Sequence, residues 1–201
     1  MSLPDVSAAD DDRAPAPRSP SEREVVDRAR AGEPEAFRLI FERHAPAVRR
    51  FLTDLLRDAS AADEATQETF VRAHAKLRTL LDGERVTSWL LGIARRVSFE
   101  QMRRRKRDPD PLLEEEPKEV DSAPTPLAAL LSGEVDRMLE GALVTLSSER
   151  RAALLLRIDH GLGYGEIALA MGWTLQKVKN EIHRARLQLR ARLSSYLEGV
   201  A

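Results

Sequence analysis

The placement of proline constrains this fold more than any other feature of the sequence. The chain has 201 residues and eleven prolines, which all fall at residues 4–20, at Pro34 and Pro46, or at residues 109–126. Two long proline-free stretches therefore flank a proline-rich segment. Because proline breaks helices, long helices are expected in those two stretches. Charged residues make up 32% of the chain and aromatic residues 4%, which favours helices over strands. The sequence predicts an all-α protein in which two small helical domains are joined by an extended linker.

Composition changes along the chain predict four segments. Residues 1–20 mix Pro, Asp, Ala and Ser, and we expect a disordered N-terminal tail. Residues 21–107 are expected to form the first helical domain. Residues 101–107 contain five basic residues, whereas residues 108–121 contain seven acids and one lysine. This change of charge beside several prolines is typical of an extended, solvated linker, which we expect at residues 108–127. Residues 128–197 are expected to form the second domain.

Apolar residues at three-to-four spacing predict the helices of the first domain. A capping box, Ser21-x-x-Glu24, opens the first helix. A second helix continues past Pro46, a third covers about residues 61–80, and a fourth covers about residues 86–105. The side chains expected in the core include Phe37, Ile40, Phe41, His44, Ala65, Phe70, Trp89, Leu90, Ile93 and Val97.

Several classes of protein are disfavoured by what the sequence lacks. It has no cysteine and four scattered histidines, so neither a disulfide framework nor a metal site is expected. The acidic N-terminus lacks an apolar signal region, and no apolar run approaches the length that spans a bilayer. No phosphate loop or nucleophile–base pair is recognisable. We expect a cytoplasmic protein that is not an enzyme, without membrane insertion, cofactor or small-molecule ligand.

The second domain contains a helix-turn-helix pattern. Residues 164–171 suit a short first helix, Gly172 stands where a left-handed residue is wanted, and Thr174 can N-cap the second helix. The second helix carries amide and basic side chains opposite an apolar face, as a DNA recognition helix requires. A basic amphipathic helix that only closes a small bundle is the alternative interpretation. The candidate DNA-binding residues are Thr174, Gln176, Lys177, Lys179, Asn180, Glu181, His183 and Arg184.

A second basic cluster lies on the predicted fourth helix. Arg95, Arg96 and Arg103 are spaced so that they can share one side of it, and a cationic helix face suits a phosphate backbone. A solvated charged face is the alternative interpretation.

On these residues the chain resembles the extracytoplasmic-function group of the sigma-70 family of RNA polymerase sigma factors. The resemblance covers residues 21–196. Its motifs in the first half are Ala36-Phe37 through Arg50, Thr66-Gln67-Glu68-Thr69-Phe70 and Trp89-Leu90-Leu91-Gly92-Ile93-Ala94-Arg95. Its motifs in the second half are Leu146, residues 151–157, Tyr164-Gly165-Glu166-Ile167-Ala168, Val178-Lys179 and His183-Arg184-Ala185-Arg186.

The resemblance implies a division of labour. The first domain would be sigma region 2, which binds the clamp of RNA polymerase core and reads and melts the minus-ten promoter element. The clamp-contact positions match Glu64, Gln67 and Glu68. The second domain would be region 4, which reads the minus-thirty-five element and binds the polymerase flap. An anti-sigma factor would be a further partner, and the acidic linker would mimic nucleic acid in the polymerase channel.

Three positions depart from the family pattern. Val86 replaces a usual Phe, Arg96 a frequent Asn, and Glu181 a usual Arg in the recognition helix. A carboxylate at position 181 would accept from cytosine or repel phosphate. Two other functions remain open: a free-standing helix-turn-helix transcriptional regulator, and a degenerate sigma-like adaptor that has lost promoter reading.

Overall fold

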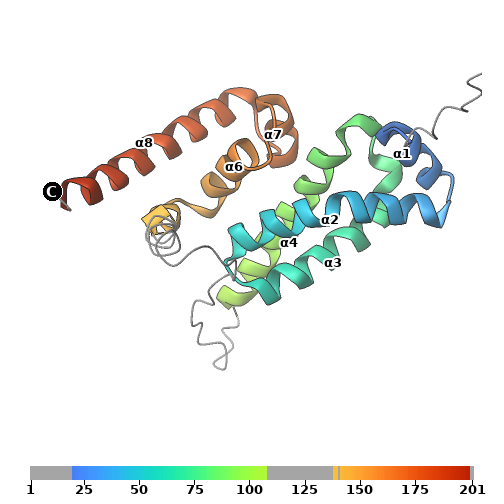
Figure 1. Ribbon diagram of the computed structural model, residues 1–201, viewed down its shortest axis with the longest axis horizontal. Helices are drawn as coiled ribbons and strands as arrows, with labels where there is room; N and C mark the ends of the chain where they lie inside the picture. Colours follow the sequence, from blue (N-terminus) through green and yellow to red (C-terminus); the bar gives the residue numbers. More distant parts are fainter. Residues whose placement is uncertain (1–19, 108–137, 140, 200–201) are drawn as a thin grey trace, which may run out of the picture.

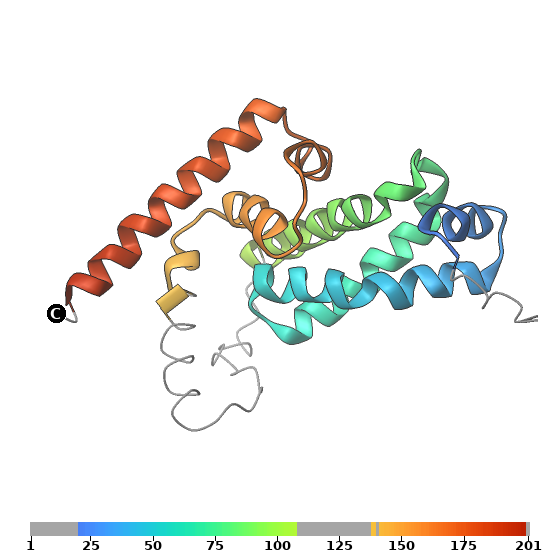
Figure 2. The same cartoon turned by 45° about the horizontal axis from the view of Figure 1, so that its top comes forward.

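The computed structural model describes residues 20–107, 138–139 and 141–199. Every regular element among them is a helix, as the sequence predicts. The predicted N-terminal tail (residues 1–20, apart from Pro20) and the predicted linker lie outside the described residues. Figures 1 and 2 show the helices that precede residue 108 side by side, with α6 and α7 next to them and α8 beyond α6 and α7.

Four helices build the first part of the chain, and they are α1 (Glu22–Arg30), α2 (Pro34–Leu56), α3 (Ala59–Lys76) and α4 (Val86–Arg107). Two short 3-10 turns, Leu77–Thr79 and Gly83–Arg85, connect α3 to α4. Helix α2 packs against α1, α3 and α4. It continues through Pro46, as predicted, and ends at Arg57, whose φ of 59° is left-handed. Its buried side carries Ile40, Val48, Phe51, Leu52 and Leu55.

The predicted capping box is present at the start of α1. The Glu24 backbone N–H donates to Ser21 Oγ at 3.3 Å, and the Ser21 N–H donates to the Glu24 carboxylate at 2.8 Å. These bonds satisfy backbone donors that a helix start leaves unpaired. They also hold Val25 and Val26 in the core, where both are buried.

We expect Ser21→Ala to lower the free energy of unfolding by about 1 kcal/mol, because it removes the side-chain acceptor of this cap. Urea denaturation followed by circular dichroism measures the change. Ser21→Asp keeps an acceptor at the same position and should stay close to the wild type. Equal losses in both variants would contradict a capping role.

The second part contains α6 (Ser148–Ile158), α7 (Tyr164–Met171) and α8 (Leu175–Gly199). Residues 138–139 and 141–144, ahead of α6, are also helical. Helix α8 packs on α6 and α7 and extends well past both of them in Figure 1. The apolar spacing of α8 predicts that Val178, Ile182, Ala185 and Leu189 face inward; the first three are buried and Leu189 is half-buried. The helix therefore has one face in the core and one face exposed.

The two parts of the chain also pack on each other. Helix α7 contacts α4, helix α6 contacts α2, and the buried apolar side chains form one continuous cluster across both contacts. The middle of α4, residues 90–94, is buried at every position. A helix buried all round must be covered on both sides, here by its own bundle and by α7.

Three predicted core residues prove less buried than expected. Phe41 was predicted to be in the core but is 42% exposed, so that prediction is wrong. Phe37 and Trp89 are only half-buried, at the edge of the core. All three lie at helical spacing from buried residues, so the periodicity places them near the core. It does not show whether another helix covers them.

Candidate nucleic-acid and partner interfaces

The helix-turn-helix has the local geometry that the sequence predicts. Gly172 ends α7 with φ 65°, in the left-handed region. The Trp173 backbone N–H donates to the Ala168 carbonyl at 2.9 Å, which closes the turn. Thr174 Oγ1 then accepts from the Lys177 N–H at 3.2 Å, so it caps the start of α8. These contacts set the angle at which α8 leaves the domain.

The outer face of α8 is polar and exposed. Gln176 Nε2 donates to Asn180 Oδ1 at 3.0 Å, and Lys177 Nζ lies 4.3 Å from the centre of the Trp173 ring. Both contacts order side chains at the N-terminal end of the helix, the end that enters a DNA groove in helix-turn-helix proteins. The candidate DNA-binding residues that are exposed here are Thr174, Gln176, Lys177, Lys179, Asn180, His183 and Arg184.

Glu181 differs from the other candidates. Its side chain is 16% exposed and forms ion pairs with Arg150 of α6 and with Arg184. The hydrogen bond from Arg150 is the main reason that the pKa of Glu181 lies below its usual range. The carboxylate is therefore charged, and it is turned toward α6.

The three candidate DNA-binding arginines of α4 differ in exposure. Arg96 and Arg103 are exposed, whereas Arg95 is half-buried and lies 5.5 Å from the centre of the Phe99 ring. Burial, together with the nearby charge of Arg96, lowers the pKa of Arg95. Of the three, only Arg96 and Arg103 are exposed. Arg105, on the same helix, pairs with Asp58 at 2.7 Å.

A close backbone contact joins α4 to α7. A Cβ atom on Gly92 would lie 3.2 Å from Ala170 Cα and 3.4 Å from Ala170 O. Both neighbours are backbone atoms, so glycine is what allows the two helices to approach this closely. One side of α4 is therefore covered by α7, the first helix of the helix-turn-helix.

Polar groups are buried where α6 meets the first bundle. Arg151 Nη1 donates to the Leu55 carbonyl at 3.4 Å, and the His160 ring meets the Phe51 ring edge-on at 5.7 Å. Within the described residues, Arg151 Nε and His160 Nε2 are buried without a hydrogen-bond partner. Unsatisfied buried polar atoms cost free energy, so this contact is weaker than its apolar area alone would make it.

We expect the packing of α6 on α2 to weaken as the pH falls from 8 to 5.5. Burial lowers the pKa of His160 below 6.5; Asp159 opposes the shift and Arg50 adds to it. Because the folded-state pKa is lowered, the neutral ring's contribution is complete above about pH 6.5 and is lost as the pH falls below it. Energy transfer between dyes on the two parts of the chain measures the effect.

The chain has no cysteine, so the dyes can be placed at Ala75→Cys and Leu187→Cys, which are both exposed positions. His160→Phe removes the titrating group and should abolish the pH response of the distance. A response that persists in His160→Phe would assign it to another group.

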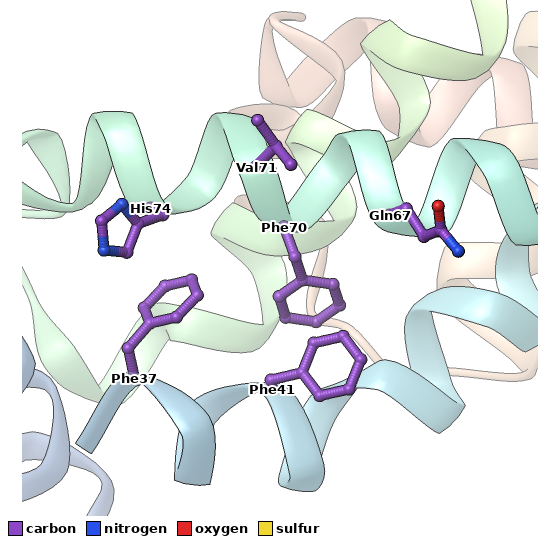
Figure 3. A pocket seen from close by; sticks show the side chains of 6 residues that line it. All are labelled: Phe37, Phe41, Gln67, Phe70, Val71 and His74. Atoms are coloured by element: carbon purple, nitrogen blue, oxygen red, sulfur yellow. The ribbon is translucent and has the colours of Figure 1, made fainter. Parts of the chain in front are cut away.

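The candidate polymerase-binding residues lie on α3, and one of them, Gln67, lines an apolar groove. Glu64 and Gln67 are exposed and Glu68 is half-buried. Arg72 pairs with Glu68 at 2.6 Å and with Glu100 of α4 at 2.8 Å. In Figure 3, phenylalanines rise from α2 toward α3, and Gln67 stands at one end of the groove. The groove is lined by Phe37, Phe41, Gln67, Phe70, Val71 and His74.

The apolar part of this surface was not predicted from the sequence. Phe41 meets Phe70 edge-on with ring centres 4.8 Å apart, and Val71 is 64% exposed. Phe41 follows Phe37 by four residues, which is also the spacing of a buried helix face. No local signal separates a core aromatic from one that lines an open groove.

Comparison with protein families identifies both halves of the chain. Residues 40–108 match the model for sigma-70 region 2, and residues 136–189 match the model for sigma-70 region 4. The two matches occur in the order that a sigma factor requires, and together they define the class of protein.

Individual relatives show which group of sigma factors the chain belongs to. The chain is 30% identical over 154 residues to the ECF RNA polymerase sigma factor EcfG of Rhodopseudomonas palustris, covering 77% of this chain and 82% of the relative. It is also 30% identical over 171 residues to the ECF RNA polymerase sigma factor SigL of Mycobacterium tuberculosis, covering 84% and 94%. The chain belongs to the extracytoplasmic-function group of the sigma-70 family.

A solved structure agrees with this assignment. The sigma factor RpoE from Bartonella quintana, in complex with the anti-sigma factor NepR, superposes with a TM-score of 0.63 at 26% identity, covering 79% of this chain and 96% of that one. Members of the family are initiation factors rather than enzymes. The described part of the chain contains no group of three or more His, Cys, Asp or Glu placed to hold a metal, and no described helix has the length and apolarity to cross a membrane.

Proposed function

We propose that this protein binds RNA polymerase core and directs it to specific promoters as an alternative sigma factor. The observation that carries the proposal is the exposed amide and basic face of α8, in a chain that matches sigma regions 2 and 4 in order. Amide and guanidinium groups read base edges, and neighbouring cations bind phosphates. Lys179, Asn180 and Arg184 stand at the centre of this proposed minus-thirty-five surface.

The second DNA surface is proposed on α4. Arg96 and Arg103 are exposed and Arg95 is half-buried, and the sigma-70 resemblance assigns minus-ten reading and melting to the domain that contains this helix. Its cationic end supplies contacts to the phosphate backbone. Since α7 covers Gly92, full access to α4 requires α7 to move away.

The polymerase surface is proposed on α3 and α2. Glu64, Gln67 and Glu68 match the family's clamp-contact positions, and the groove beside Gln67 adds exposed apolar area. Interfaces depend on a few apolar anchors within a polar rim, and this surface has both. Region 4 would bind the polymerase flap.

The domain limits follow the same scheme. We assign region 2 to residues 21–107, the acidic linker to residues 108–127 and region 4 to residues 128–197, after an N-terminal tail of residues 1–20. The Bartonella relative was crystallised with an anti-sigma factor, which supports an anti-sigma partner here too. The protein would act where the polymerase is, in the cytoplasm.

Run-off transcription with polymerase core on the gene's own upstream region tests this function. We expect a discrete transcript only when both the protein and core are present. Failure of the protein to bind core in a pull-down would overturn the proposal. Core binding without any transcript would instead favour a sigma-like adaptor.

A gel shift without polymerase separates the sigma factor from a conventional regulator. We expect little binding by the protein alone. Tight, salt-sensitive binding to an operator in the absence of core would favour the free-standing regulator.

A further inference from the structure

We propose that Glu181 is a positioning residue that fixes the recognition helix α8 on α6 and orients Arg184, and that it does not read a base itself. The inference rests on the proposed function, in which α8 reads promoter DNA. It starts from the acid on a helix whose other charged residues between Trp173 and Arg192 are basic.

Glu181 is held at both carboxylate oxygens. Arg150 Nε donates to Oε2 at 2.9 Å, and Arg184 Nη1 donates to Oε1 at 3.0 Å. The side chains of Arg150 and Glu181 are 24% and 16% exposed, so solvent screens this pair less than a surface ion pair. Hydrogen bonds between charged groups are the strong ones in proteins.

The same arginine reaches a second turn of α8. Arg150 Nη1 donates to Gln188 Oε1 at 3.1 Å, and Gln188 Nε2 donates to the Thr145 carbonyl at 2.8 Å. Residues 181 and 188 are two turns apart, so they lie on one face of the helix. This network ties α8 at two points to α6 and to the segment before it, and it resists rotation of α8 about its own axis.

Rotation of α8 about its own axis would disrupt base reading, because the reading side chains would change direction. Asn180 and Arg184 flank the network, and both project from the exposed face. Arg184 is 64% exposed although one nitrogen is held by Glu181. Glu181 therefore restricts Arg184 while leaving its other donors available to DNA. A defined orientation reduces the entropy lost when that side chain binds.

The alternative, in which Glu181 reads a base, has a free-energy cost that follows from the geometry of the pair. A carboxylate that turned toward a base would leave the half-buried Arg150 without its charged partner. Removing one partner of a buried pair is strongly unfavourable. The pair thus explains why an acid is compatible with a DNA-binding helix: its charge is neutralised by a partner from α6.

The test compares Glu181→Gln and Arg150→Met in holoenzyme made with core polymerase. Transcription is measured from the cognate promoter and from one with a scrambled minus-thirty-five element, at a temperature where every variant is folded. We expect the ratio of the two to fall roughly tenfold in each variant, and no further in the double variant, because both changes break one interaction. A merely structural role would lower the melting temperature and leave this ratio unchanged.

The preferred base at each promoter position distinguishes a positioning role of Glu181 from direct base reading. On promoters randomised in the minus-thirty-five element, positioning predicts the same preferred sequence in wild type and both variants, with shallower discrimination at every position. A change of preferred base at one position in Glu181→Gln, absent from Arg150→Met, would overturn the proposal and identify Glu181 as a base reader. An unchanged ratio in both variants would also overturn it.

Three controls complete the design. Glu149→Gln removes the same charge from an exposed neighbour in α6 and should leave the ratio unchanged. The exchange Glu181→Arg with Arg150→Glu restores an ion pair and should recover part of the loss. Gln188→Met removes only the outer bond, so it serves if Arg150→Met fails to fold. Absence of promoter-specific transcription by the wild type would refute the proposed function instead, which keeps the two failures distinct.

Discussion

Val71→Asp is expected to weaken binding to RNA polymerase core by about thirtyfold or more. Val71 is 64% exposed and lines the apolar groove between α2 and α3 (Figure 3). A charge there would be desolvated by a bound partner, and anchor residues at interfaces contribute about 2 kcal/mol or more, which is about thirtyfold in affinity. Because the side chain is exposed in the free protein, the substitution should leave the fold intact.

Affinity for core is measured in the absence of DNA by fluorescence anisotropy of labelled protein. Leu81→Asp is the matched control, since Leu81 is 94% exposed and lies in the connection after α3, outside the groove. It should bind core as the wild type does. Equal losses in both variants would indicate a general effect of the added charge, and no loss in Val71→Asp would remove the groove from the polymerase surface.

Gly92→Leu is expected to separate α7 from α4. Even a Cβ at this position would lie 3.2 Å from Ala170 Cα, and backbone atoms on a packed helix cannot move aside as a flexible side chain can. Overpacking of this kind costs about 1–3 kcal/mol. The helices should release that strain by parting, because α7 can keep its contacts with α6 and α8 when it separates from α4. Energy transfer between dyes at Ala75→Cys and Leu187→Cys should fall.

Gly165→Leu is the control for this change. Gly165 lies on α7, and a Cβ atom added to it would have no neighbouring atom within 4 Å, so the larger side chain has open space to occupy. Energy transfer should stay at the wild-type level in this variant, and circular dichroism should show equal helix content in both. Retained energy transfer in Gly92→Leu would mean that α4 and α7 accommodate the side chain while remaining in contact.

Local features of the fold were predictable because they depend on neighbours in the sequence. The capping box at Ser21 and Glu24, the left-handed Gly172 and the cap at Thr174 all involve residues at most four positions apart. The buried side of α8 was predictable for the same reason, since helical spacing alone aligns Val178, Ile182 and Ala185.

The candidate site was predictable in part. Exposure of the polar face of α8 follows from its periodicity. The partner of Glu181 does not, because Arg150 lies 31 positions away. Glu181 was predicted to contact DNA because it follows the polar residues of α8. Its ion pair with Arg150 depends on how α8 packs on α6. Burial of Arg95 likewise depends on packing around α4 and not on its helical spacing.

The sequence by itself determined the helical class, the helix-turn-helix and the resemblance to the sigma-70 family, since local spacing and motif order encode each of them. Tertiary structure alone decided three other features: the exposure of Phe41 in an open groove, the pairing of Glu181 with Arg150, and the contact of Gly92 with Ala170. Each depends on residues distant in the chain being brought together. Helical periodicity shows which face of a helix is apolar, but only packing shows what covers that face.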